Sequence, residues 1–278
     1  MAKGPGTVLP LPDVIARWEL GPLPEPVPLT GGYHNDVFRL GDAVARVERR
    51  EPASVAWEHE LLAWLAAEVP EVIAPLAAPD GSTLAVVDDR VISLFPFVDG
   101  APATGLAAAP VYARIHARGA SWPGLRQRPD RPSYADLDWE RNDWWDWSLV
   151  PKPPELVRAF EQTRAWIWSA PPLVVTPVHG DPAAQNMLAR GGRVRGVVDW
   201  EWARLDWPAL ELALAAWTFA EGKPASFVDA YRDAGGPGEP DMLAEGRRLQ
   251  LLVNALYSLT RGRDVDWIDY LLAELRQL

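Results

Sequence analysis

The sequence of 278 residues predicts an α+β protein with two lobes. A small antiparallel sheet is expected over residues 1–98, and a larger helical lobe is expected over residues 99–278. Two observations support this prediction of the fold. Short apolar runs in the first third are separated by glycine or aspartate pairs, which is the pattern of hairpins. Most of the remaining chain consists of longer segments with the apolar spacing of helices.

The N-terminal lobe is predicted in chain order from these turns. Residues 29–40 form a hairpin about a glycine pair, and residues 44–47 add a strand. A helix is expected over residues 52–67, because proline is well suited to the first helical turn. Residues 83–97 form a second hairpin. The chain leaves this strand at Phe97-Val98, where we expect a hinge to the second lobe.

The C-terminal lobe is predicted to be mainly helical. The expected helices cover residues 103–118, 134–149, 153–169, 208–220, 225–234, 242–261 and 265–276. One hairpin interrupts them, because two short apolar runs flank Gly191-Gly192.

This hairpin carries the candidate chemistry. It places Asp181 and Asn186 before its first strand and Asp199 after its second, so the three side chains are expected at the same end of the hairpin. Carboxylate and amide oxygens are suitable ligands for Mg²⁺, which binds few protein groups and keeps phosphate or water as its other ligands. The remaining aspartate is then free to orient a nucleophilic hydroxyl group.

The motif H-G-D-x-x-x-x-N followed by V-V-D-W-E resembles the aminoglycoside phosphotransferase and choline kinase superfamily. Protein kinases would show H-R-D and D-F-G instead. The resemblance implies a bilobal, protein-kinase-like fold and transfer of the γ-phosphoryl group of ATP or GTP to a hydroxyl group. It implies that Asp181 is catalytic and that Asn186 and Asp199 bind Mg²⁺.

Two departures from the family pattern stand near this motif. The residues Pro182-Ala183-Ala184 replace the L-H-x that often follows H-G-D, so loop contacts to the substrate are expected to differ. Glu211 stands where the family often has an aspartate that supports the catalytic loop, and a glutamate is expected to do so with a longer reach.

The glycine hairpin of the first lobe resembles the L-x-G-G-x-x-N motif of the nucleotide-binding lobe in this superfamily. Its glycines allow backbone amides to approach phosphates closely. The nucleotide-binding residues that the resemblance implies here are Gly31, Gly32, Tyr33, His34 and Asn35. Phe97 and Val98 are expected at the hinge, whose backbone is placed to bind adenine.

A nucleotide-binding lobe of this kind also needs a cation on its third strand. The only lysines are Lys3, Lys152 and Lys223, and all three lie elsewhere, so Arg46 in V-A-R-V is the candidate. Its guanidinium group can engage two phosphate oxygens at once. The kinase pattern requires a helix glutamate beside this cation, and the sequence offers Glu58, which we prefer, and Glu60.

The segment 134–149 is dense in acidic residues and tryptophan, which predicts a cationic acceptor. Carboxylates pair with ammonium groups, and tryptophan faces attract cations. We expect an aminoglycoside or a cationic peptide antibiotic, and hence a resistance kinase. The alternative structural interpretation is an amphipathic helix whose tryptophans face the core. The expected acceptor-binding residues are Asp143, Trp144, Asp146, Trp147 and Glu201.

Two other functions stay open at this point. One is a metabolic kinase for choline, homoserine, a fructosamine or a thioribose. The other is a nucleotide-binding pseudokinase, although loss of Asp181, Asn186 or Asp199 would have marked it and all three are present.

The composition narrows the expected partners and location. The formal net charge of -11 argues against binding the phosphate backbone of nucleic acids and favours a cationic small molecule. Zero cysteines exclude disulfides and fit a cytoplasmic protein. The apolar runs are far shorter than the roughly 20 residues of a membrane helix, and we expect no secretory signal. We expect a monomer.

Overall fold

The computed structural model describes residues 9–29, 35–170, 174–220, 222–237, 241–262 and 264–278. The chain forms two compact units that are not continuous in sequence. Unit 1 consists of residues 1–102, 128–130 and 185–201, and unit 2 consists of residues 103–127, 131–184 and 202–278. The simpler boundary after residue 98 stays a prediction.

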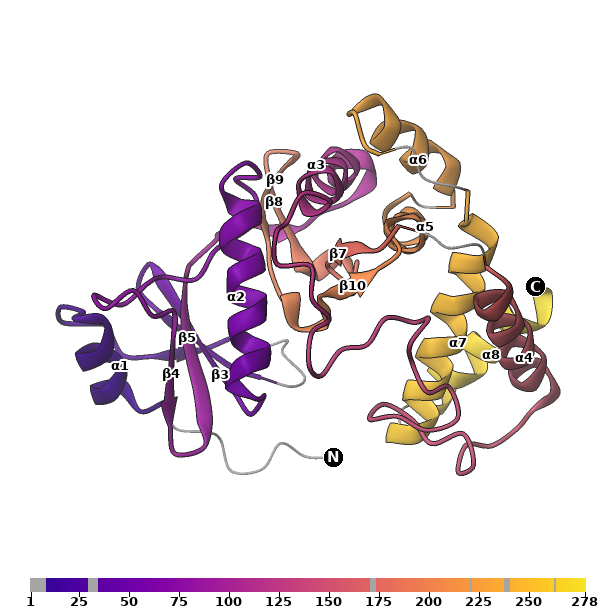
Figure 1. Cartoon of the computed structure of the whole chain (residues 1–278), viewed down its shortest axis with the longest axis horizontal. Helices are drawn as coiled ribbons and strands as arrows, with labels where there is room; N and C mark the ends of the chain where they lie inside the picture. Colours follow the sequence, from indigo (N-terminus) through magenta and orange to yellow (C-terminus); the bar gives the residue numbers. More distant parts are fainter. Residues whose placement is uncertain (1–8, 30–34, 171–173, 221, 238–240, 263) are drawn as a thin grey trace. The chain divides into compact units, whose positions relative to one another are not determined.

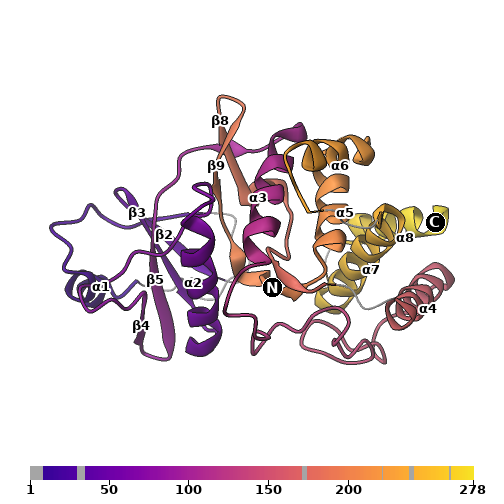
Figure 2. The same cartoon turned by 45° about the horizontal axis from the view of Figure 1, so that its top comes forward.

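Unit 1 is built on a five-stranded antiparallel sheet with the strand order β1-β2-β3-β5-β4 (Figure 1). Two helices, α1 and α2, lie on opposite faces of this sheet in both views (Figures 1 and 2). The bounds are β1 (Val27–Pro28), β2 (Asp36–Leu40), β3 (Ala43–Glu48), β4 (Leu84–Val87), β5 (Arg90–Pro96), α1 (Leu11–Trp18) and α2 (Pro52–Ala66).

The alternation of side chains along β3 places a charged pair on one face of the sheet. Ala45 and Val47 are buried in the same hydrophobic cluster as Trp18 of α1. Because successive residues of a strand point to opposite faces, Arg46 and Glu48 face α2. The strand therefore contributes apolar packing on one side and paired charges on the other.

A second, three-stranded sheet in unit 1 contains the predicted hairpin about Gly191 and Gly192. Both glycines have positive φ angles, +59° and +74°, which glycine adopts without steric cost. The strand order is β6-β8-β9. The bounds are β6 (Ala101–Pro102), β8 (Met187–Arg190) and β9 (Arg193–Val197), with the short 3-10 helices η2 (Ala184–Asn186) and η3 (Trp200–Trp202) beside them.

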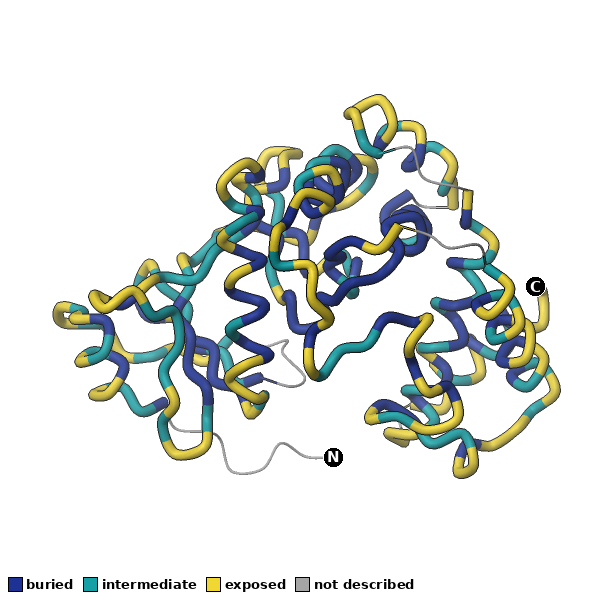
Figure 3. The backbone as a smooth tube through the Cα atoms, viewed as in Figure 1, coloured by how far each residue is buried: buried dark blue, intermediate teal, exposed yellow. Residues whose placement is uncertain are grey.

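Unit 2 is mainly helical, and its helix α5 is buried over most of its length (Figure 3). Helices α4, α7 and α8 pack around a second core rich in tryptophan and leucine. The bounds are η1 (Gly105–Ala108), α3 (Ala109–Gly119), α4 (Pro154–Ser169), β7 (Thr176–Val178), β10 (Arg204–Asp206), α5 (Pro208–Phe219), α6 (Pro224–Asp233), α7 (Leu243–Arg261) and α8 (Val265–Gln277). In the part of the chain that the structure describes, no helix has the length and apolar character needed to cross a membrane.

The helix predicted over residues 134–149 was wrong, because this segment consists of turns and bends. Short polar side chains bond to the backbone just beyond them. The Asp138 carboxylate accepts from the N–H of Glu140 and Arg141, and Asn142 Oδ1 accepts from the N–H of Trp144. Such local bonds offer the backbone an alternative to helix formation.

The tryptophans of this segment pack into unit 2. Trp139 and Trp145 are buried, and their rings lie 5.6 Å apart. Trp145 Nε1 donates to the Trp139 carbonyl, and Trp139 Nε1 donates to the Tyr134 carbonyl. The burial of these rings agrees with the alternative interpretation in which tryptophans face the core, although the backbone is not helical.

Candidate active site

The cation predicted on the third strand forms a buried ion-pair cluster in unit 1. Arg46 Nε donates to Glu48 Oε1 over 3.0 Å, and Arg46 Nη2 donates to Glu58 Oε1 on α2 over 2.5 Å. Arg50 pairs with the same two glutamates. Of the two helix glutamates left open by the sequence, Glu58 therefore makes the contact, while Glu60 is exposed.

The cluster keeps its charges although it is buried. Burial alone would raise the pKa of Glu58, but the neighbouring charges of Arg46 and Arg50 outweigh this effect and lower the pKa to about 2. Burial opposes the charge on Arg46, yet Glu48 and Glu58 raise its pKa above the usual value. The guanidinium group is thus held ionised and in a fixed orientation.

Of the five residues of the glycine hairpin that are predicted to bind the nucleotide, Asn35 lies within the described residues. Gly31, Gly32, Tyr33 and His34 lie outside the described residues. Asn35 is buried, and its Nδ2 donates to Glu201 Oε2 over 2.9 Å. A residue predicted to bind the nucleotide and a residue predicted to bind the acceptor are therefore partners of each other within unit 1.

The predicted hinge residues belong to unit 1 and pack within it. The N–H of Phe97 donates to the Asp42 carbonyl over 2.8 Å, and the Arg39 guanidinium carbon lies 3.8 Å from the centre of the Phe97 ring. Val98 lies close to β9, where a Cβ added at Gly196 would come within 2.9 Å of a Val98 methyl group. The N–H of Phe97 therefore already donates a hydrogen bond within the protein.

The two predicted metal ligands belong to unit 1 and are tied to one another through the backbone. The N–H of Val198 donates to the Asn186 carbonyl over 2.9 Å, which holds the segments before β8 and after β9 side by side. Asn186 is buried, whereas Asp199 is exposed and has a φ of +62°. This conformation is sparsely populated by residues other than glycine.

The donor set fits Mg²⁺ bound together with phosphates. Asn186 offers an amide oxygen and Asp199 offers a carboxylate. Within the described ranges, no group of three or more His, Cys, Asp or Glu side chains could enclose a metal ion. Mg²⁺ is commonly held by one or two protein ligands and by substrate phosphates, so two oxygen donors are sufficient for such a site.

The predicted catalytic residue Asp181 belongs to unit 2, where Glu211 of α5 supports its loop. Glu211 Oε1 accepts from the N–H of Gly180 over 2.6 Å, and Oε2 accepts from the N–H of His179 over 3.0 Å. Asp181 itself is half-buried. Glutamate at this position therefore makes the contacts expected of the shorter aspartate.

Glu211 is in turn held by a buried chain of polar side chains. His116 Nε2 lies 2.9 Å from Glu211 Oε2, and His116 Nδ1 lies 3.0 Å from the Tyr231 hydroxyl. Burial alone would raise the pKa of Glu211, but the contact with His116 and the backbone N–H of Gly180 lower it. An ionised carboxylate thus accepts from the loop that carries Asp181.

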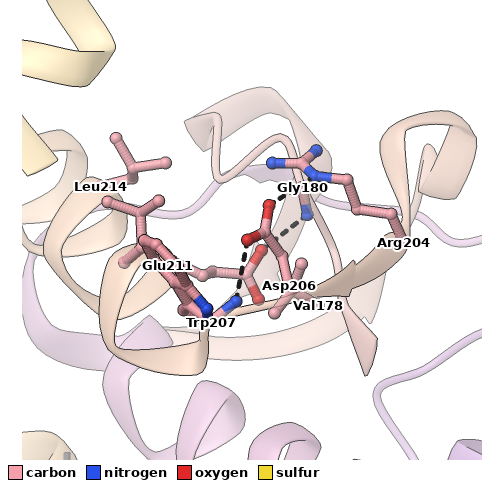
Figure 4. A pocket seen from close by; sticks show the side chains of 8 residues that line it. Val178, Gly180, Arg204, Asp206, Trp207, Glu211 and Leu214 are labelled. Atoms are coloured by element: carbon pink, nitrogen blue, oxygen red, sulfur yellow. Dashed lines mark hydrogen bonds and ion pairs between the residues drawn. The ribbon is translucent and has the colours of Figure 1, made fainter. Parts of the chain in front are cut away.

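Figure 4 shows the small cavity behind this loop, with Gly180, Arg204, Asp206 and Glu211 around it. Arg204 Nε donates to Asp206 Oδ2 over 2.7 Å, so these two charges neutralise each other. The cavity has room for about one water molecule. It is too small for an acceptor.

The residues predicted to bind a cationic acceptor are largely occupied by other protein groups. Trp144 is buried, and Trp147 stacks on Phe160 with the ring centres 3.9 Å apart. The Lys152 ammonium lies 5.2 Å from the centre of the Trp147 ring. Asp146 accepts from the Ser148 hydroxyl, which lowers its pKa, whereas Asp143 is exposed.

Three members of the Arg46 cluster were not predicted from the sequence: the buried Glu48, the largely buried Arg50, and Arg128, which reaches Glu58 from another part of the chain. The positions of Glu48 and Arg50 near Arg46 are visible in the sequence, and Glu48 follows from strand alternation. No sequence pattern marks Arg128.

Comparison with known proteins identifies the family to which the chain belongs. A homoserine kinase of Gluconobacter oxydans (strain 621H) is 26% identical over an alignment of 286 positions, and the alignment covers 92% of this chain and 86% of that protein. The structure of an amicoumacin kinase in complex with AMP-PNP and Ca²⁺ matches with a TM-score of 0.78 and 13% identity over 96% of this chain and 92% of that chain.

A microcompartment-associated aminopropanol kinase matches with a TM-score of 0.72 and 17% identity over 95% of this chain and 93% of that chain. These structural matches show a kinase-like fold. The model of the phosphotransferase enzyme family matches residues 25–248. Since this match covers most of the sequence, the chain belongs to the phosphotransferase enzyme family and is a kinase of small molecules.

Proposed function

We propose that the protein transfers the γ-phosphoryl group of ATP or GTP to the hydroxyl group of a small acceptor that also carries an amine. The observation that best supports nucleotide binding in this proposal is the buried Arg46–Glu58 ion pair. A cation that is already oriented by the fold needs no reorganisation when it meets phosphate oxygens, which is the basis of electrostatic catalysis.

The remaining roles follow from the chemistry of each side chain. Asp181 would accept a hydrogen bond from the acceptor hydroxyl and orient its oxygen for attack. Asn186 and Asp199 would hold Mg²⁺, which when bound supplies positive charge at the phosphate oxygens. Glu211 would keep the catalytic loop in place through the N–H groups of His179 and Gly180.

For the acceptor, we favour a small amino alcohol. A homoserine kinase is 26% identical to this chain, and one of the structural neighbours is an aminopropanol kinase. Both names denote molecules that carry a hydroxyl group and an amine. The formal net charge of -11 favours a cationic group on the acceptor.

A second candidate function is resistance to an aminoglycoside or another cationic antibiotic, supported by the fold match to an amicoumacin kinase. The packing of Trp144 and Trp147 disfavours an acceptor cation bound against their rings. Phe160 and Lys152 already occupy positions against the Trp147 ring, where a bound cation was expected.

An acceptor panel tests the proposal. Homoserine, aminopropanol, choline and an aminoglycoside are each offered with ATP and with GTP, and phosphorylated product is identified by ³¹P NMR. Propanol serves as the matched control for aminopropanol because it lacks the amine. We expect kcat/KM for the preferred amino alcohol to exceed that of its amine-free counterpart by at least about tenfold, the value of one charge-assisted contact. Equal values for the two would contradict the amine requirement.

A further inference from the structure

Arg128 is a buried arginine that joins unit 1 from a loop far away in sequence. Residues 128–130 belong to unit 1, although the residues on either side belong to unit 2. The side chain of Arg128 is fully buried. A charge without access to water is costly unless its hydrogen-bonding groups are satisfied by the protein.

One edge of the Arg128 guanidinium group contacts helix α2. Its Nε donates to Ser54 Oγ over 2.8 Å, and its Nη2 donates to Glu58 Oε2 over 3.1 Å. Glu58 is the residue that holds Arg46 through its other carboxylate oxygen. Arg128 and Arg46 are therefore connected through one glutamate.

The Nη1 atom of the same guanidinium group contacts the backbone just after Asp199. It donates to the carbonyl oxygens of Trp200 and Glu201, both over 3.2 Å. A single planar group thus links the Arg46–Glu58 pair to the two residues that follow the proposed metal ligand. The rigid geometry of guanidinium makes this link directional, which a lysine could not reproduce.

The backbone at Asp199 needs such support. A φ of +62° is unfavourable for a residue with a side chain, and such conformations persist where the surrounding contacts determine them. On the preceding side, the N–H of Val198 donates to the Asn186 carbonyl. On the following side, Arg128 holds the Trp200 and Glu201 carbonyls. The strained residue lies between these two fixed points.

We infer that Arg128 is a positioning residue, which fixes the orientation of the Asp199 carboxylate toward Mg²⁺ and couples it to the Arg46–Glu58 pair. The inference rests on the proposed function, because it assigns Asp199 to the metal. Loss of Arg128 leaves two buried carbonyls and one glutamate oxygen without this donor. The loop after Asp199 is then free to relax, and the carboxylate is no longer held for the metal.

The test compares two arginines of the same cluster. Arg128→Met removes the donors to Glu58 and to the metal loop while retaining an apolar chain. Arg50→Met is the matched control, because Arg50 is also largely buried and, in the part of the chain that the structure describes, its contacts are with Glu48 and Glu58. Both changes disturb the ion-pair cluster, whereas the first alone removes the contacts to Trp200 and Glu201.

The readout is binding rather than turnover. The dissociation constant of AMP-PNP is measured by calorimetry with and without Mg²⁺, and bound Mn²⁺ is counted by electron paramagnetic resonance. We expect Mg²⁺ to strengthen AMP-PNP binding in the wild type and this gain to fall about tenfold or more in Arg128→Met, the usual cost of disturbing groups behind a metal ligand. Arg50→Met should retain the gain from Mg²⁺ within about twofold, even where its affinity for AMP-PNP alone and its melting temperature fall.

Each outcome decides the inference. A folded Arg128→Met that keeps the wild-type gain from Mg²⁺ would overturn it. If Arg128→Met does not fold, Arg128→Lys takes its place: it keeps the charge but not the planar set of donors, and an undiminished gain there would also overturn the inference. A wild type whose AMP-PNP binding is indifferent to divalent metal would instead contradict the proposed function itself.

Discussion

At the scale of single residues, the charges buried in unit 1 are the clearest sign of function. Arg46, Arg50 and Arg128 share the carboxylates of Glu48 and Glu58. A buried ion pair is often no more stabilising than well-packed apolar side chains of the same volume. The arrangement is therefore better explained by the need to hold a cation in a defined orientation than by stability.

The sequence predicted part of this cluster and missed the rest for a physical reason. Arg46 followed from the absence of lysine on the strands, and Glu58 followed from its spacing on the helix. Arg128 joins the cluster through tertiary contacts from residues 128–130, which no local periodicity records. The role that we infer for Arg128 depends on its hydrogen bonds in the folded chain.

His59 provides a test of this charged environment through pH. The side chain is buried beside the cluster, and its Nδ1 lies 2.8 Å from Thr83 Oγ1. Burial, with the charges of Arg46 and Arg50, lowers its pKa to about 4 from a usual value of 6.5. Between these two values the unfolded chain binds a proton that the folded chain does not, so stability falls as the pH drops from 6.5 toward 4.

We therefore predict that His59→Asn reduces the loss of stability on acidification. Between pH 7 and pH 5 the wild type should lose about 2 kcal/mol more of its unfolding free energy than the variant does. Urea denaturation at the two pH values measures this difference. Equal losses in both proteins would show that His59 titrates normally in the fold.

At the scale of elements, the loop between β7 and η2 shows how the fold fixes the side chain that we propose to be catalytic, Asp181. Gly180 has a φ of +82°, and an added Cβ would lie 2.1 Å from the Trp202 carbonyl oxygen. No rotation of a side chain relieves a clash with backbone. The H-G-D motif therefore needs its glycine for space as well as for its φ angle.

We predict that Gly180→Ala lowers kcat by at least about 100-fold, since displacement of a catalytic group by about 1 Å has this cost. The matched control is Gly235→Ala. Gly235 has a nearly identical φ of +80°, but an added Cβ there would meet nothing within 4 Å. Steady-state kinetics should show near-normal turnover for the control. Similar losses in both variants would mean that backbone strain, and not the Trp202 contact, explains the effect.

Some of the hairpins and turns could be predicted from the sequence, and others could not. The Gly191-Gly192 hairpin could be predicted, because positive φ angles at a two-residue turn demand glycine. Residues 134–149 could not, because their apolar spacing is compatible with a helix. The competing bonds from Asp138 and Asn142 to nearby N–H groups decided the outcome there.

At the scale of the whole molecule, the order of motifs along the chain was sufficient to predict the kinase-like fold. The order of motifs was not sufficient to predict which segments belong to which unit. Residues 185–201 belong to unit 1 because β8 pairs with β6, and Val197 forms a bridge with Val72. Such pairings join residues far apart in sequence, and the sequence alone offers several partners for a short apolar strand.

In the proposed function, Asp181 orients the acceptor hydroxyl while other residues hold the nucleotide and its metal. The most direct test is Asp181→Ala, examined for single-turnover phosphoryl transfer from ATP and, separately, for Mg²⁺-dependent binding of AMP-PNP. We predict that transfer falls by about 10²–10⁴-fold, the usual contribution of a positioned acid–base group, while AMP-PNP binding stays within about twofold of the wild type. Transfer at the wild-type rate in a folded Asp181→Ala protein would contradict this role of Asp181.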